Sequence, residues 1–223
     1  RPLSRGLGDV YKRQNIYMNK KFIIVEGSEG VGKSFQIKVI EQYLISNHID
    51  YILTREPGGT SFGEAIRDII LNEDNNTEEL TDSLLFYASR FENYKKIILP
   101  ALDAGKAVIC DRYHYSTLVY QGIVGNNSTV KDIHQIFDSI YSKMIDHIIY
   151  LYTSPDISFK RISKRTITDK FESRGLDYLK ELSDAYELVF SDMKNVTKID
   201  TSGNKNATKD TLVKSLDKIF SKP

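Results

Sequence analysis

The loop from Gly27 to Ser34, GSEGVGKS, constrains this chain more than any other segment, because it completes the pattern GxxxxGK[ST]. An apolar run, FIIV, comes just before it, and a segment of helical periodicity follows it. Glycines at the end of a strand permit a turn so tight that successive backbone N–H groups point at one anion, and the following helix adds its positive N-terminal end. The loop therefore predicts a phosphate cradle, with an ordinary Gly-rich turn as the alternative.

Two side chains of this loop favour a nucleotide over an ordinary turn. Lys33 would reach the β- and γ-phosphates and Ser34 would ligate Mg²⁺, whereas a plain strand-to-helix turn needs neither. We therefore expect a nucleoside triphosphate to be bound by the whole loop: Gly27, Ser28, Glu29, Gly30, Val31, Gly32, Lys33 and Ser34.

Composition argues against several classes of protein. With 223 residues, 40% of them hydrophobic, the chain can bury one sizeable core, so a single domain is expected. Its 31 basic and 30 acidic residues give a net charge of +1, which argues against nucleic-acid binding through bulk charge. The apolar runs are far shorter than the roughly 20 residues of a membrane span, and a single cysteine excludes a disulfide within the chain. We expect a cytoplasmic protein with no nucleic-acid or membrane partner.

The N-terminal stretch differs from the rest of the chain. Residues 1–17 have neither helical nor strand periodicity and lack the apolar centre of a signal peptide, while Met18 stands close before the first apolar run. We expect 1–17 to be a non-native extension and 18–223 to form the single domain. A native arm is the alternative.

Short apolar runs alternate with longer amphipathic segments from there to the C-terminus. This alternation predicts a parallel sheet with helices on both faces, and ligands of such sheets bind beyond the carboxyl ends of the strands. The expected strands cover 22–26, 51–54, 107–110, 147–152 and 196–199. The expected helices cover 33–47, 62–71, 78–104, 113–122, 130–143, 155–164, 175–192 and 207–220.

Charged residues follow the second and third expected strands. Arg55 and Glu56 precede a proline and two glycines in TREPGGT, which forces a turn, and a solvated loop is the alternative to a binding role. Asp111 follows its strand as an acidic residue does in the Mg²⁺ element of P-loop enzymes. Arg112 offers a planar fork for a phosphate, unless it forms a structural ion pair with Asp111.

Two helical faces carry groups suited to a ligand. Phe86 and Arg90 are four apart and share a face; a core aromatic beside a snorkelling cation is the alternative. Thr117, Tyr120 and Gln121 fall at i, i+3 and i+4 on the next helix. Three hydrogen-bonding groups on one face near the strand ends suit a polar ligand.

A basic segment after the fourth strand is a candidate lid, at about 160–174. Arg161, Lys164 and Arg165 lie at i, i+3 and i+4, and no clear apolar stripe follows them. Phosphoryl transfer needs cations around the oxygens that carry charge in the transition state, and the loop 27–34 supplies only Lys33. A solvated basic helix face is the alternative.

The chain resembles the bacterial thymidylate kinase family in five segments: FIIVEGSEGVGKS, TREPGGT, LLFYASRFE, LPALDAGKAVICDRYHYSTLVYQG and KRISKRTITDKFE. The resemblance runs from Phe22 to about Asp200. It implies an α/β, three-layer P-loop kinase fold: a five-stranded parallel sheet of order 2-3-1-4-5, helices on both faces and a short lid. It also implies transfer of the γ-phosphoryl group of ATP to dTMP, giving dTDP, with Mg²⁺ and in a homodimer.

The resemblance further implies how the acceptor nucleotide is bound. Phe86 would stack on thymine and Arg90 would hydrogen-bond the base edge. Thr117 and Gln121 would add base contacts, and the ring of Tyr120 would crowd the 2′ position and favour deoxyribose.

The remaining implied roles concern phosphates and sugar. Arg112 would clamp the phosphate of dTMP with support from Arg55 and Arg67, and Glu29 would approach the acceptor's sugar hydroxyl. Because the loop has no arginine, the lid would supply the catalytic arginines, Arg165 first and Arg161 second. The predicted catalytic residues are Lys33, Arg112, Arg165 and Arg161; Glu56 joins the predicted dTMP contacts, and Ser34 and Asp111 are the predicted metal ligands.

Some positions depart from the pattern of the family. Phe35 stands where a second threonine usually follows GK[ST], and Lys170 replaces an arginine in the lid. His114 and Tyr115 replace a pair whose second member is often acidic or small.

Two other functions are compatible with the P-loop. One is a P-loop nucleotide kinase with a different acceptor. The other is an NTPase switch that controls a protein partner, which would need neither a base pocket nor a phosphate clamp.

Overall fold

The computed structural model describes residues 20–72, 74–75, 77–165 and 171–221. Its centre is a parallel sheet in the order β2-β3-β1-β4-β5, as the sequence predicts. The strands are β1 Phe22–Glu26, β2 Tyr51–Arg55, β3 Ala107–Asp111, β4 His147–Tyr152 and β5 Val196–Asp200.

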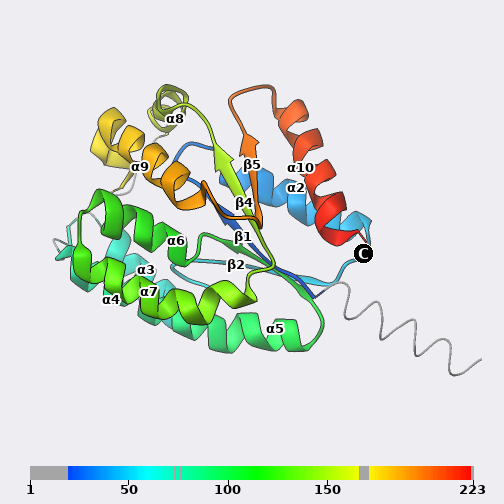
Figure 1. Cartoon of the computed structure of the whole chain (residues 1–223), viewed down its shortest axis with the longest axis horizontal. Helices are drawn as coiled ribbons and strands as arrows, with labels where there is room; N and C mark the ends of the chain where they lie inside the picture. The colour runs from blue at the N-terminus through cyan, green and yellow to red at the C-terminus, as the bar shows by residue number, and fades with distance from the viewer. Residues whose placement is uncertain (1–19, 73, 76, 166–170, 222–223) are drawn as a thin grey trace, which may run out of the picture.

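The strand side chains alternate between two apolar cores. Phe22 and Ile24 of β1 belong to one core, and Ile23 and Val25 belong to the other. This alternation is the period of two that a strand imposes on its side chains. Helices therefore cover both faces of the sheet, with α2 and α10 together on one side and α3, α4 and α7 on the other (Figure 1).

The helical elements in chain order are α2 Lys33–Ser46, α3 Ser61–Leu71, α4 Glu79–Asn93, η1 Tyr94–Ile98, α5 Leu99–Asp103, α6 His114–Thr117, η2 Leu118–Val124, α7 Ser128–Tyr141, η3 Ser142–Met144, α8 Pro155–Ile162, η4 Glu172–Arg174, α9 Gly175–Phe190 and α10 Lys205–Phe220. Side-chain caps explain several starts. Thr60 accepts from Gly63 N at 3.0 Å before α3, and Asn127 accepts from Val130 N at 3.2 Å before α7.

Two expected helices are interrupted by π-helical turns. The expected helix 78–104 consists of α4, η1 and α5, and the expected helix 113–122 consists of α6 and η2. A π-helical turn inserts a residue into the helical repeat, so a search at the period of 3.6 cannot find it. Tyr120 and Gln121 lie within η2.

The strand register places charged residues at one edge of the sheet. Arg55 lies opposite Asp111 across the β2–β3 pair, and Asp111 lies opposite Val25 across the β1–β3 pair. Both strands extend one residue further than expected, so Arg55 and Asp111 are their last residues. The P-loop leaves the same edge after Glu26. Within the described part of the chain, every helix is too short or too polar to cross a bilayer.

Candidate active site

The P-loop wraps around the ammonium group of its own lysine. Lys33 Nζ donates to the carbonyl oxygens of Gly27 at 2.8 Å and Ser28 at 2.9 Å. Gly27 has φ 143°, and a Cβ there would lie 2.3 Å from the carbonyl oxygen of Leu151, so the turn requires glycine. Burial, followed by the neighbouring Arg112 cation, lowers the pKa of Lys33 to about 8.

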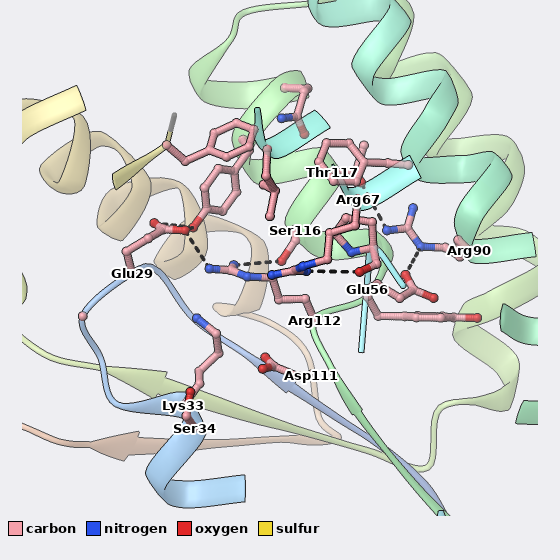
Figure 2. Close-up of a pocket in the computed structure, with 18 of the residues that line it drawn as sticks. Glu29, Lys33, Ser34, Glu56, Arg67, Arg90, Asp111, Arg112, Ser116 and Thr117 are labelled. Atoms are coloured by element: carbon pink, nitrogen blue, oxygen red, sulfur yellow. Dashed lines mark hydrogen bonds and ion pairs between the residues drawn. The ribbon is translucent and has the colours of Figure 1, made fainter. Parts of the chain in front are cut away.

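A carboxylate and a hydroxyl lie beside that lysine. Asp111 and Ser34 both line the cavity that Lys33 borders, and in Figure 2 the side chains of Lys33 and Asp111 point toward the same space beneath Arg112. Asp111 Oδ1 is buried and has no hydrogen-bond partner among the described residues. A buried carboxylate oxygen without a donor, next to a hydroxyl, is a donor set that fits a hard divalent cation such as Mg²⁺.

Arg112 lies at the centre of the hydrogen-bond network of the site. Its backbone adopts φ 63°, in the left-handed region that side chains other than glycine seldom occupy. Its guanidinium donates to Glu29 Oε1 at 2.7 Å, to the Gly27 carbonyl at 3.0 Å and to Ser116 Oγ at 3.2 Å (Figure 2). Among the described residues, this guanidinium forms its ion pair with Glu29 and not with Asp111, so the structure does not support a simple Asp111–Arg112 pair.

Two acidic residues belong to the hydrogen-bond network of Arg112: Glu29 contacts it directly, and Glu26 is linked to it through Ser116. Glu29 also accepts a hydrogen bond of 2.6 Å from the hydroxyl of Tyr120. Glu26, fully buried at the end of β1, accepts from Tyr113 N at 2.8 Å and from Ser116 Oγ at 2.7 Å. Burial raises the pKa of Glu26. The Arg112 side chain is therefore fixed before any ligand arrives.

Arg90 is buried rather than snorkelling. It is 1% exposed, and its Nε donates to Glu56 Oε2 at 2.6 Å while its Nη2 donates to Thr117 Oγ1 at 3.2 Å. Its Nη1 is buried without a hydrogen-bond partner in the described structure. Glu56 also accepts from Asn93 Nδ2 at 3.3 Å, and burial raises its pKa to about 7 in spite of the Arg90 cation. A buried guanidinium with one spare donor pair suits recognition of a polar edge.

One cavity of about 290 Å³ joins these groups. It brings together most of the side chains predicted for the site: Glu29, Gly30, Gly32, Lys33, Ser34, Glu56, Arg67, Phe86, Arg90, Asp111, Arg112, Thr117, Tyr120, Gln121 and Arg165. Gly27, Ser28 and Val31 are buried and are not among the lining residues, although Gly27 and Ser28 hold Lys33 through their carbonyls.

Two predicted arginines lie outside the cavity lining. Arg55 is turned to the exposed Glu64, with 2.7 Å between Nη2 and Oε2. Arg161 donates to the carbonyl oxygens of Gly30 at 3.1 Å and Thr201 at 2.7 Å, so it fastens the P-loop to the segment after β5. Charged side chains can bond to groups that are near in space but distant in the sequence, and sequence spacing does not reveal such partners.

The candidate lid is described at its two ends. Arg165 and Phe171 line the cavity from either side of 166–170. The interval 166–170, which includes the departure at Lys170, lies outside the described residues. Phe35, the departure next to the P-loop, is 38% exposed, and Lys205 Nζ lies 5.4 Å from the centre of its ring.

Five further residues line the cavity and were not predicted as site residues: Pro57, Leu71, Tyr113, Ser116 and Phe171. Ser116 could have been found, because it lies four residues from both Arg112 and Tyr120. Tyr113 and Leu71 could not have been found in this way, because the sequence pattern predicts that an apolar or aromatic residue in a helical or buried segment belongs to the hydrophobic core.

Comparison with known proteins shows which family the chain belongs to. A sequence model of the thymidylate kinase family matches residues 25–212. The chain belongs to the thymidylate kinase family. A thymidylate kinase of Clostridium novyi (strain NT) is 41% identical over 174 residues, which cover 76% of this chain and 84% of that protein. The thymidylate kinase of Caldicellulosiruptor saccharolyticus is 35% identical over 207 residues, covering 92% of this chain and 100% of its own length. That of Francisella tularensis subsp. holarctica (strain LVS) is 32% identical over 206 residues, covering 91% and 98%.

Proposed function

We propose that the cavity transfers the γ-phosphoryl group of ATP to dTMP, giving dTDP, the reaction for which its family is named. This proposal rests on one observation: residues of a P-loop and residues suited to a nucleobase line the same cavity. A P-loop with a half-buried lysine lines one part, and a buried arginine with an unpaired Nη1 among the described residues lines another. Arg112 lies between Glu29 on one side and the Glu56 region on the other (Figure 2).

The acceptor half is suited to a pyrimidine base and one phosphate. Phe86 is half-buried at the cavity wall, where a base can stack on its ring. Arg90 has a spare Nη1, and Thr117 and Gln121 add polar groups beside it. We assign Arg112, with Arg67 near it, to the phosphate of dTMP, and Tyr120 to the sugar.

The donor half provides charge and a cation site. Lys33 would contact the β- and γ-phosphates through the ammonium group that the Gly27 and Ser28 carbonyls now hold. Asp111 and Ser34 would hold Mg²⁺, which when bound neutralises charge on the phosphates of ATP. Arg165, at the cavity rim, would supply a further cation to the transferred group.

The chemistry requires little proton transfer. The acceptor phosphate is already an anion and can attack in line without a general base, so the main obstacle is repulsion between two anions. Lys33, Arg112 and Arg165 supply the positive charge that offsets this repulsion. Closure of the lid would exclude water and so protect ATP from hydrolysis.

Release of ADP in the presence of ATP and Mg²⁺, measured with and without dTMP, tests the proposal. We expect release to depend on dTMP and to respond weakly to dCMP, dGMP and AMP. Strong stimulation by one of those monophosphates in place of dTMP would reassign the acceptor. Steady ADP release with no acceptor would favour the NTPase switch.

We also infer a homodimer in the cytoplasm. Large apolar side chains are exposed on the adjacent helices α3 and α4: Phe62 at 50%, Ile69 at 46%, Leu84 at 52% and Phe91 at 50%. Apolar groups gathered on neighbouring helices are typical of a subunit interface. Cys110 is a buried free thiol, which is consistent with a reducing compartment.

A further inference from the structure

A second cluster of ligand-type side chains lies outside the proposed transfer site. His134 and Asp138 are four residues apart on α7, so they share one face of that helix. His114 opens α6, which packs on α7. One ligand atom from each of these three residues lies within 4.8 Å of the other two.

The cluster has the form that metal sites built on two helices take. His114 Nε2 lies 2.9 Å from Asp138 Oδ1, and the two imidazole centroids are 5.1 Å apart. Two imidazoles bound to a tetrahedral Zn²⁺ at about 2.0 Å have centroids roughly 5 Å apart. The ligand atoms of such a site are about 3.3 Å from one another, so the largest separation here would have to close by roughly 1.5 Å.

The buried polar atoms of the cluster are only partly satisfied. His114 is fully buried and His134 is 7% exposed, and the Nδ1 atom of each is buried with no hydrogen-bond partner among the described residues. A neutral imidazole has one nitrogen without a proton, so each of the two rings can offer one lone pair to an ion.

The protonation states favour a cation. Burial lowers the pKa of His114 to about 3 and that of His134 to about 4, so both imidazoles are neutral near pH 7. The hydrogen bond from His114 lowers the pKa of Asp138, which is therefore ionised. Two neutral imidazoles and one carboxylate are the ligand forms that Zn²⁺ binds.

We propose that His114, His134 and Asp138 bind one divalent transition-metal ion of the Zn²⁺ class, at a site separate from the Mg²⁺ ligands Ser34 and Asp111. Nitrogen ligands select Zn²⁺ and its neighbours over Mg²⁺, which prefers oxygen. The Asp138 side chain is 38% exposed, which gives the ion a path from solvent and leaves room for a water as fourth ligand.

The ion would fasten the start of α6 to α7. Helix α6 begins two residues after Arg112 and ends at Thr117, and both of these residues line the large cavity. Its effect on the protein would therefore be to stiffen the wall of that cavity. The site uses none of the residues assigned to phosphoryl transfer, so failure of either proposal leaves the other intact.

Titration of the full chain with Co²⁺ tests the proposal. The protein is first freed of metal with a chelator, and Mg²⁺ is present in excess so that the oxygen site is occupied. We expect one equivalent of Co²⁺ to give visible absorption bands typical of a four-coordinate ion, and Zn²⁺ to displace it. Zn²⁺ should also raise the midpoint of thermal unfolding.

Variants assign the ligands. His134→Gln and Asp138→Asn each remove one ligand of the cluster, and each should weaken metal binding by at least about tenfold. His48→Gln, at an exposed histidine, and Asp111→Asn should retain it. Absence of saturable binding, or undiminished binding in both cluster variants, would overturn the proposal and leave a buried His–Asp hydrogen bond. Circular dichroism checks that each variant is folded.

Discussion

Two neighbouring residues of TREPGGT illustrate how burial decides the value of an ion pair. Arg55 pairs with Glu64 at the surface, where the two side chains are 53% and 41% exposed. Glu56 pairs with Arg90 in the interior, where both side chains are 2% exposed. An exposed pair contributes little because water screens it, whereas removing one partner of a buried pair leaves an uncompensated charge.

The two pairs predict losses of stability of different size for the same substitution. Glu56→Gln should lower the free energy of unfolding by about 3 to 5 kcal/mol, because it leaves the Arg90 cation buried without its counter-ion. Glu64→Gln, the matched control, should lower it by about 1 kcal/mol or less. Urea unfolding at about pH 8, above the pKa of Glu56 so that its carboxyl is mostly ionised, measures both. Equal losses in the two variants would mean that the interior pair tolerates a missing charge.

Lys33 predicts a pH dependence in the binding of the donor. Its pKa of about 8 means that the free protein loses this cation as the pH rises through 8. The kcat/KM for ATP should then fall by roughly tenfold per pH unit above the pKa, because it reports the free protein. The phosphates of bound ATP would raise the pKa of Lys33 again, so kcat at saturating ATP should persist to higher pH. Profiles of both constants from about pH 6 to about pH 9 test this; a joint decline beginning at the same pH would contradict it.

At the scale of the elements, the sequence predicts the regular parts best. The five strands and their order follow from apolar runs and from the family resemblance, and the strand ends differ by one residue at most. The π-helical turns η1 and η2 are missed because they interrupt the helical repeat locally. The left-handed backbone of Arg112 is missed as well, because tertiary contacts impose it on a residue that does not favour it.

The same reasoning explains which arginines reach the cavity. Arg112 follows from its position after a strand end and Arg90 from the family resemblance, and both line the cavity. Arg55 and Arg161 have equally suggestive positions, but Arg55 bonds to Glu64 and Arg161 bonds to the backbone carbonyls of Gly30 and Thr201. Partners such as Thr201 are distant in the sequence, so a single sequence cannot predict these bonds.

Two arginines four residues apart, Arg161 in the last turn of α8 and Arg165 after that helix, are expected to have different roles. Arg165→Ala should lower kcat by roughly 100-fold or more, because the transition state would lose a lid cation, while the affinity for dTMP changes little. Arg161→Ala should mainly raise the KM for ATP, because Arg161 holds the Gly30 carbonyl of the P-loop. Steady-state kinetics and calorimetric titration with dTMP separate the two effects. An intact kcat in Arg165→Ala with a lost kcat in Arg161→Ala would reverse the roles.

At the scale of the whole molecule, the exposed apolar side chains of α3 and α4 predict association. Leu84→Glu places a charge among them and should shift the protein from dimer to monomer, since a buried unpaired charge opposes association. Leu188→Glu on α9, where the leucine is 68% exposed, is the matched control and should leave the dimer intact. Sedimentation velocity over a range of concentrations measures the mass. A wild-type protein that sediments as a monomer throughout would contradict the inferred homodimer.

Because Glu29 contacts Arg112, a carboxylate of the protein itself occupies the cation that we propose for the acceptor phosphate. The carboxylate of Glu29 already satisfies the guanidinium at 2.7 Å, and the Tyr120 hydroxyl holds that carboxylate in place. An acceptor phosphate that bound Arg112, as proposed, would compete with Glu29 for this guanidinium, and the affinity measured for the acceptor would include the free energy of breaking the Glu29 contact. On release of the product, Glu29 would return to the arginine and so favour departure of the phosphate.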